Sequence, residues 1–165
     1  EMIPEIKKIL YATDLSENSL SAFAYAASIA NRYGAGVTIL HVMETISPNA
    51  TAQIAAYIGD EEWAGIMKRN KQEVMDTIKT RLENFCAEAI SEIPECPFIT
   101  DATLVKEGHA PDVILDEAHN GDFDLVVMGT HGHSAFVDAM MGGTARRVLR
   151  RCKKPVLTVR VPKED

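Results

Sequence analysis

Short apolar runs alternate along the chain with longer segments whose apolar residues recur at helical spacing. Five runs are short, apolar and rich in β-branched residues, as is typical of strands that are buried on both faces. They occupy residues 7–13, 37–43, 98–105, 124–128 and 155–161. Because a helical segment separates each run from the next, the pattern predicts successive β-α-β units with right-handed crossovers.

Three of the expected helices carry clear boundary signals. The first follows Ser16, a plausible N-cap, and stops at Gly34, a residue that readily adopts the left-handed conformation. Another spans residues 110–119 and has Pro111 near its first turn, where proline is tolerated. The last one begins near a glycine pair and ends at Cys152.

The middle of the chain holds one irregular segment and one long helix. Residues 44–62 contain Pro48, Asn49 and Gly59 and are expected to be irregular. The helix that follows has apolar residues at steps of three, four or seven, and its stripe is expected to face the core. The stripe consists of Trp63, Met67, Val74, Ile78, Leu82, Phe85 and Ala89.

Together these elements predict an α/β fold: an open five-stranded, mostly parallel, Rossmann-like sheet with helices on both faces. The length of 165 residues is that of a single domain, residues 1–165. In such sheets ligands bind at the carboxyl ends of the strands, where the strand order reverses. The chemistry is therefore sought at the strand ends.

Composition and charge narrow the possible partners. Apolar residues make up 46% of the chain and charged residues 25%, the mix of an ordinary globular domain. The net charge of −7 repels a polyanion, so we expect no nucleic-acid partner. The basic cluster at residues 146–154 is interpreted as the end of a helix whose dipole favours cations. No run approaches the ~18 apolar residues of a membrane helix, so no membrane partner is expected.

Cysteine usage and the N-terminus predict a cytoplasmic protein. Cys86, Cys96 and Cys152 lie at no metal-ligand spacing, and their odd number suits a reducing compartment. Residues 1–4 lack the basic stretch and apolar block that begin a signal peptide.

Two strand ends carry residues suited to ligand binding. The first expected strand ends in Ala12-Thr13-Asp14, and the fourth ends in Met128-Gly129-Thr130-His131-Gly132. Gly142-Gly143-Thr144 then opens a helix. Glycines permit close approach of the backbone, and the unpaired N–H groups of a helix start attract anions. The segment is therefore interpreted either as a phosphate cradle or as a tight turn with a helix cap.

The motif Gly129-x2-Gly132-x9-Gly142, between an apolar strand and a helix ending in Lys154-Pro155-Val156-Leu157, resembles the nucleotide-binding signature of the universal stress proteins. The start ILYATDLSENSLSAFAYAASIA and the block GHAPDVILDEAHNGDFDLVVMGTHG resemble the same family. The resemblance covers nearly the whole chain except residues 44–62.

The resemblance implies a homodimer that binds ATP, ADP or AMP and acts as a stress-response sensor or switch. Asp14 would contact the adenine or ribose end of the nucleotide, and Ala12 and Thr13 would line it. Val42 and Met128 would form apolar walls for the base. The backbone of Gly129, His131 and Gly132 would approach the ribose and phosphate, and Gly142, Gly143 and Thr144 would hold the phosphates. In some members Mg or Mn accompanies the phosphates.

One position departs from the family pattern. The residue after the third glycine is serine or threonine in the family, whereas here it is Gly143, and Thr144 comes one residue late. The hydroxyl is thereby shifted by about 100° around the helix. This substitution bears on phosphate affinity more than on base binding.

Alternatives remain beside nucleotide sensing. No Lys or Arg lies between Gly129 and Thr144, and the pattern GxxxxGK[ST] is absent, so no catalytic residue is assigned. Slow ATP hydrolysis or phosphotransfer stays open, as does a nucleotide-free dimeric interaction module. His131 and His133 alone make a poor zinc site, so no metal ligand is assigned.

The last strand also predicts how two copies would pair. Val156, Leu157, Val159 and Val161 give it an apolar edge, and an exposed edge strand invites pairing with another copy. We expect antiparallel pairing of residues 156–161 across a two-fold axis.

Overall fold

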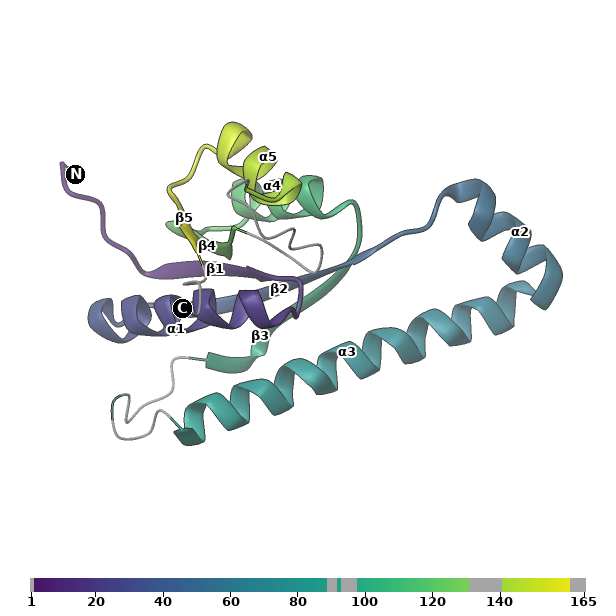
Figure 1. Ribbon diagram of the computed structural model, residues 1–165, viewed down its shortest axis with the longest axis horizontal. Coiled ribbons are helices and arrows are strands. Elements are labelled where there is room, and N and C mark those ends of the chain that lie inside the picture. The colour runs from purple at the N-terminus through teal and green to yellow at the C-terminus, as the bar shows by residue number, and fades with distance from the viewer. Residues whose placement is uncertain (1, 89–91, 93–97, 131–140, 161–165) are drawn as a thin grey trace, which may run out of the picture.

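The computed structural model of the chain describes residues 2–88, 92, 98–130 and 141–160. Its five strands form one parallel sheet in the order β3-β2-β1-β4-β5 (Figure 1). The strands are β1 (Lys8–Thr13), β2 (Gly36–Glu44), β3 (Phe98–Gly108), β4 (Leu125–Gly129) and β5 (Val156–Val159). The α/β fold with a five-stranded parallel sheet is thus confirmed.

Four helices pack on the two faces of this sheet. They are α1 (Glu17–Tyr33), α3 (Asp60–Glu88), α4 (Ala110–Asn120) and α5 (Gly143–Arg151). Alternate strand residues point to opposite faces, so Tyr11 packs with α1 and α3 while Leu10 packs with α4 and α5. From β1, the strands β2 and β3 follow in order toward one edge of the sheet, whereas β4 lies on the other side of β1. The strand order therefore reverses between β1 and β4.

The predicted boundaries of α1 are confirmed by its cap geometry. Ser16 is the N-cap, and its side chain accepts a hydrogen bond from the Ser19 N–H. Gly34 closes the helix in the left-handed conformation, with φ 64°. These caps fix where α1 begins, and therefore where the turn that follows β1 lies.

The segment at residues 44–62 differs from the irregular structure that was expected. Residues Pro48–Ile58 form a further helix, α2, whose N-cap Ser47 accepts a hydrogen bond from the Ala50 N–H at 3.2 Å. Pro48 stands in the first turn and Gly59 is the C-cap. Pro48 and Gly59, on which the expectation of irregular structure rested, thus mark the two ends of a helix.

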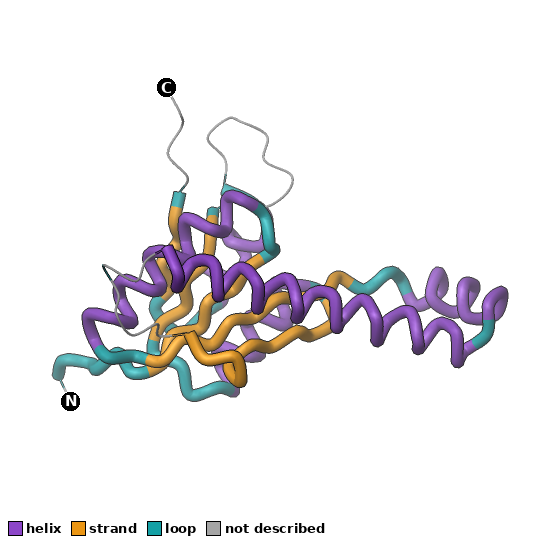
Figure 2. The backbone as a smooth tube through the Cα atoms, turned by 90° about the horizontal axis from the view of Figure 1, so that it is seen from below, coloured by secondary structure: helices purple, strands orange, loops and turns teal. Residues whose placement is uncertain are grey.

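The stripe along α3 is also only partly a core stripe. Ile78 and Leu82 are the buried residues of this helix, and Val74 and Phe85 pack at the edge of the same core. At 1.5 Å per residue α3 is about 44 Å long, whereas β1 spans about 20 Å. The helix therefore extends well beyond the end of the sheet. Its first half and α2 project from the body (Figures 1 and 2), and we call residues 48–72 the arm.

Two further expectations are modified. Val159, expected on an apolar edge, is buried in the core beside α1, and Val161 lies outside the described residues. Cys86 is disulfide-bonded whereas Cys152 is a free thiol. The odd number of cysteines therefore does not mean that all are reduced.

Candidate functional site

A cavity of about 320 Å³ opens at the carboxyl ends of β1, β2 and β4. It lies where the strand order reverses, the usual place for ligands in open α/β sheets. The starts of α4 and α5 complete its wall. The lining residues are Ala12, Thr13, Asp14, Ser19, Leu40, Val42, Glu44, Ala110, Ile114, Met128, Gly129, Thr130, Gly142, Gly143, Thr144 and Ala145.

The turn after β1 is held by a network of short polar contacts. Asp14 Oδ1 accepts hydrogen bonds from the Ser16 N–H at 3.0 Å and from Ser16 Oγ at 2.5 Å. Thr13 Oγ1 accepts from the Leu15 N–H at 3.0 Å and lies 2.8 Å from Ser19 Oγ. Asp14 therefore stabilises the start of α1, as a helix-start carboxylate does. The same network fixes Asp14 at the cavity wall.

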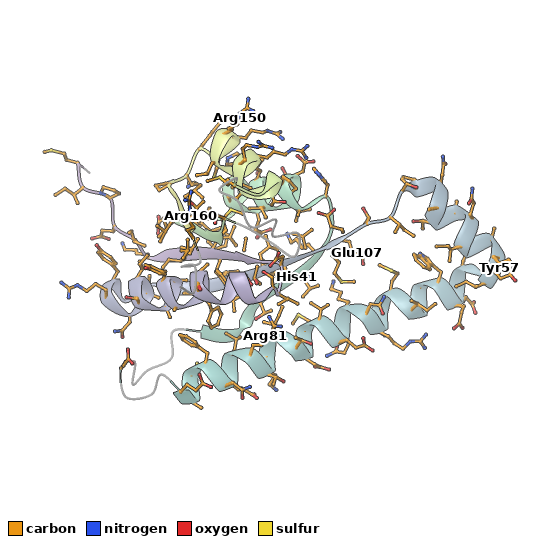
Figure 3. All side chains as sticks on the ribbon, viewed as in Figure 1. His41, Tyr57, Arg81, Glu107, Arg150 and Arg160 are labelled. Carbon is orange, nitrogen blue, oxygen red and sulfur yellow. The ribbon has the colours of Figure 1, made fainter. Side chains whose placement is uncertain are left out.

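The same turn contains a backbone conformation that is unusual for its residue. Leu15 has φ 64°, in the left-handed region that a residue with a branched apolar side chain rarely adopts. The Arg81 guanidinium, which reaches over from α3, donates to the Leu15 carbonyl at 2.6 Å (Arg81 is labelled in Figure 3). A contact across 66 residues thus braces the turn that carries Asp14.

A second carboxylate lies at the end of β2. Glu44 Oε1 accepts a hydrogen bond from the Ala110 N–H at 3.1 Å, at the first residue of α4. The carboxylate supplies an acceptor for a helix start that lacks a side-chain cap from its own N-cap residue, His109. Glu44 thereby joins β2 to α4 beside the cavity.

The start of α5 is the part of the cavity best suited to an anion. Gly142 is the N-cap, and its N–H donates to the Thr130 carbonyl at 2.7 Å. Within the described part of the chain no side chain caps this helix. The first N–H groups of a helix have no acceptor inside it, and Gly143, Thr144 and Ala145 all line the cavity. These N–H groups and the positive end of the dipole favour a negatively charged ligand group.

Polar contacts join the start of α4 to the middle and the end of α5. Arg147 Nη1 lies 3.2 Å from His109 Nε2, and Arg151 Nη1 donates to Asp112 Oδ1 at 3.1 Å. His109 Nδ1 lies 2.8 Å from Asp112 Oδ2. The hydrogen bond from His109, with Arg151 beside it, lowers the pKa of the Asp112 carboxyl. Part of the basic cluster on α5 is therefore paired with α4.

The structure brings together most of the residues that the sequence singled out. Nine of them line the one cavity: Ala12, Thr13, Asp14, Val42, Met128, Gly129, Gly142, Gly143 and Thr144. His131 and Gly132 lie outside the described residues. Thr144 lines the cavity although it comes one residue late in the motif. Beside the cavity, His41 Nδ1 lies 2.9 Å from the Thr13 carbonyl oxygen.

Other lining residues were not singled out by the sequence. Thr130 and Ala145 stand next to predicted residues, and Leu40 lies two residues before Val42 on the same face of its strand. Glu44 lies two residues after Val42, also on that face, whereas Ser19, Ala110 and Ile114 have no such neighbour. Their approach depends on the strand order, which the sequence pattern does not fix.

The cavity lining offers different groups to different parts of a ligand. Among the described residues no group of three His, Cys, Asp or Glu side chains could hold a metal ion. The cavity combines carboxylate acceptors, apolar walls from Val42, Ile114 and Met128, and a helix start. Its volume falls at the lower end of small-molecule pockets, which span about 300–1,000 Å³.

In the described part of the chain, no helix has the length and apolarity needed to cross a membrane.

Comparison with solved structures places the fold. Hypothetical protein MJ0577 superposes with a TM-score of 0.72 at 22% identity, covering 98% of this chain and 100% of that one. The universal stress protein UspA from Lactobacillus plantarum gives 0.71 at 22% identity, with 96% and 100% covered. A universal stress protein solved in complex with cAMP gives 0.56 at 22% identity, with 95% and 98% covered.

Sequence comparison gives the family. Universal stress protein MJ0531 of Methanocaldococcus jannaschii is 28% identical over 162 residues, which cover 96% of this chain and 85% of that protein. A universal stress protein of Thermus aquaticus is 29% identical over 154 residues, covering 93% and 98%. The family model described as "Universal stress protein family" matches residues 5–160. This chain therefore belongs to the universal stress protein family.

Proposed function

We propose that this protein binds an adenine nucleotide, ATP or its relatives ADP and AMP, in the cavity at the β1–β4 strand ends. The observation that carries the proposal is the start of α5, which no side chain of the described residues caps and whose first residues form part of the wall of a cavity that Asp14 also lines. A helix start attracts phosphate, and a carboxylate accepts hydrogen bonds from ribose hydroxyls or an amino group. The cAMP complex of a protein with the same fold supports this choice of ligand.

The role that fits this site is that of a cytoplasmic sensor or switch in the stress response, working as a homodimer through residues 156–161. A bound nucleotide shifts a protein toward the conformations that bind the nucleotide best. It can therefore change a surface to which a partner protein binds. β5 is the outermost strand of the sheet, beyond β4, and Val156 and Leu157 are only partly buried. That edge supports pairing with a second copy.

Binding is favoured over rapid turnover by the charges around the cavity. Among the described residues that line it, none is a Lys, Arg or His. Phosphoryl transfer needs positive groups to stabilise charge on the transferring phosphate. Mg or Mn bound with the phosphates would supply positive charge, while the residues of α5 would hold the phosphate oxygens through backbone N–H groups.

The first experiment is to denature freshly purified protein and identify the released small molecules by mass spectrometry. A stoichiometric ATP, ADP or AMP supports the proposal. An empty preparation is then titrated by calorimetry with ATP, ADP, AMP and cyclic AMP, with and without magnesium, and with GTP as the control for the base. Absence of heat with every nucleotide at millimolar concentration would refute nucleotide binding and favour a nucleotide-free interaction module.

A further inference from the structure

The arm exposes apolar side chains to different extents. Residues 48–58 form a helix in which no residue is buried. Tyr57, at the tip in Figure 3, is 91% exposed, and Ile54 and Ile58 are 36% and 37% exposed. A helix of this length is marginal in water unless its apolar side packs against something. The arm therefore has the character of an interaction surface.

One face of the arm is marked by a glycine and by charges on both sides of it. A Cβ built on Gly65 meets no atom within 4 Å, so this side of α3 faces away from α2 and from the body. Arg69 Nη2 lies 3.8 Å from Glu62 Oε1, so these two side chains share a face across Gly65. Both side chains are more than 60% exposed, and such an ion pair contributes little to the stability of one copy.

The order of charges along this face is self-complementary. Glu61 and Glu62 stand four and three residues before Gly65, and Lys68 and Arg69 stand three and four residues after it. All four are exposed. A two-fold axis through Gly65 would set the acidic turn of one helix against the basic turn of an antiparallel second copy.

We infer that the arms of two copies pair through an antiparallel contact of their α3 helices centred on Gly65. A polyanion or an anionic membrane gains nothing from a face with two negative and two positive charges, so a second copy is the partner that the pattern fits. The absence of a side chain at Gly65 lets the two helix axes approach closely, since the distance between packed helices depends on the residues at the contact. Isologous contacts of this kind are the commonest in homo-oligomers.

This surface is distinct from the strand edge at β5. α3 packs along β3, at one edge of the sheet, while β5 forms the other edge. The two contacts therefore do not compete, and dimers joined through β5 could be linked further through their arms. The inference also does not depend on nucleotide binding.

A cysteine at the two-fold axis tests the contact directly. In a Cys152→Ser background, Gly65→Cys is expected to form an intermolecular disulfide under mild oxidation, read as a covalent dimer on a non-reducing gel. The matched control is Gln72→Cys, which lies on the same helix face but about 20 Å from its counterpart in the antiparallel arrangement. Equal cross-linking of both variants, or none with Gly65→Cys, would overturn the inference.

Charge exchange tests the pairing of the two turns. In the Gly65→Cys background we expect Glu61→Lys/Glu62→Lys to lose the cross-link, because four positive charges would face four positive charges. Lys68→Glu/Arg69→Glu should lose it for the opposite reason. An equimolar mixture of the two variants should regain it as a heterodimer. Cross-linking of either variant alone at the parent level would show that the charges do not direct the contact.

Discussion

Replacing Gly143 by aspartate should change the stability of the free protein and its affinity for nucleotide in opposite directions. Gly143 is the first residue of α5, is exposed, and has open space where a Cβ would stand. Its φ lies outside the left-handed range, so a side chain causes no backbone strain. A carboxylate at a helix start is favourable by about 0.3–1 kcal/mol, and removing a glycine from the helix adds to that gain.

The same carboxylate would stand where the phosphates of the proposed ligand bind. Two unit charges about 5 Å apart repel by about 3 kcal/mol at an effective dielectric constant of 20. That corresponds to a loss of affinity of about 100-fold, and screening by salt at this open site reduces it toward about 10-fold. The repulsion grows with the charge of the phosphate chain, so ATP should lose more affinity than AMP.

The assay is isothermal titration calorimetry in the absence of divalent metal, paired with thermal unfolding of the free proteins. Gly143→Ala is the matched control: it should gain stability in the same direction and keep its affinity. If Gly143→Asp bound ATP as tightly as Gly143→Ala, the phosphates would not lie at the start of α5, and the proposed orientation would be refuted.

Three further predictions concern the turn, the sheet and the edge strand. Ser16→Ala removes the N-cap of α1 and a hydrogen bond to Asp14. The free energy of unfolding should fall by about 1 kcal/mol, which lowers the midpoint of thermal unfolding by about 2–4 °C. An unchanged midpoint would contradict the capping role of Ser16. The Asp124 carboxylate accepts from the N–H groups of Lys7 and Lys8, which lowers its pKa below 3.8. Wild type should therefore be more stable than Asp124→Asn above that pH and lose its advantage as the pH falls through the lower pKa of the folded state; a difference that persists in acid urea titrations would contradict this. The carbonyls of Pro155 and Val159 point to β4, so by alternation the Thr158 N–H points outward, and Thr158→Pro should give monomers on a sizing column while Thr158→Val stays dimeric.

The sequence was informative where local chemistry decides the structure. The five apolar runs became strands because both faces of a parallel sheet are covered, so no polar alternation interrupts them. Ser16 and Gly34 mark the ends of α1 through their own side-chain and backbone preferences. The same holds for Asp14, which stands directly after a strand, and for Gly142, which stands directly before a helix. Both residues line the same cavity.

Other features depend on which elements become neighbours. Glu44 and Ala110 meet at the cavity because β2 lies between β1 and β3, an order that residue patterns do not encode. The Arg81 guanidinium donates a hydrogen bond to the Leu15 carbonyl, 66 residues away in the sequence, and neither residue type predicts that contact. The sequence pattern does not predict the helix Pro48–Ile58, because a proline and a glycine within one short segment favour irregular structure, whereas here they stand at the two ends of the helix.

The central position of β1 has a consequence for how the chain acquires its structure during synthesis. β1 is hydrogen-bonded to β2 on one side and to β4 on the other, in the registers Ile9–Val37 and Ile9–Leu125. The first neighbour follows β1 within about thirty residues, but the second follows β1 only after more than a hundred residues. Until β4 leaves the ribosome, one edge of an apolar strand has no partner.

Such an edge is a template for pairing with other chains. Contacts between distant parts of a chain also form slowly, because their closure entropy must be overcome first. Chains that end before residue 125 should therefore be more prone to aggregation than the full sequence. The last quarter of the sequence supplies both the second neighbour of the central strand and the edge strand β5.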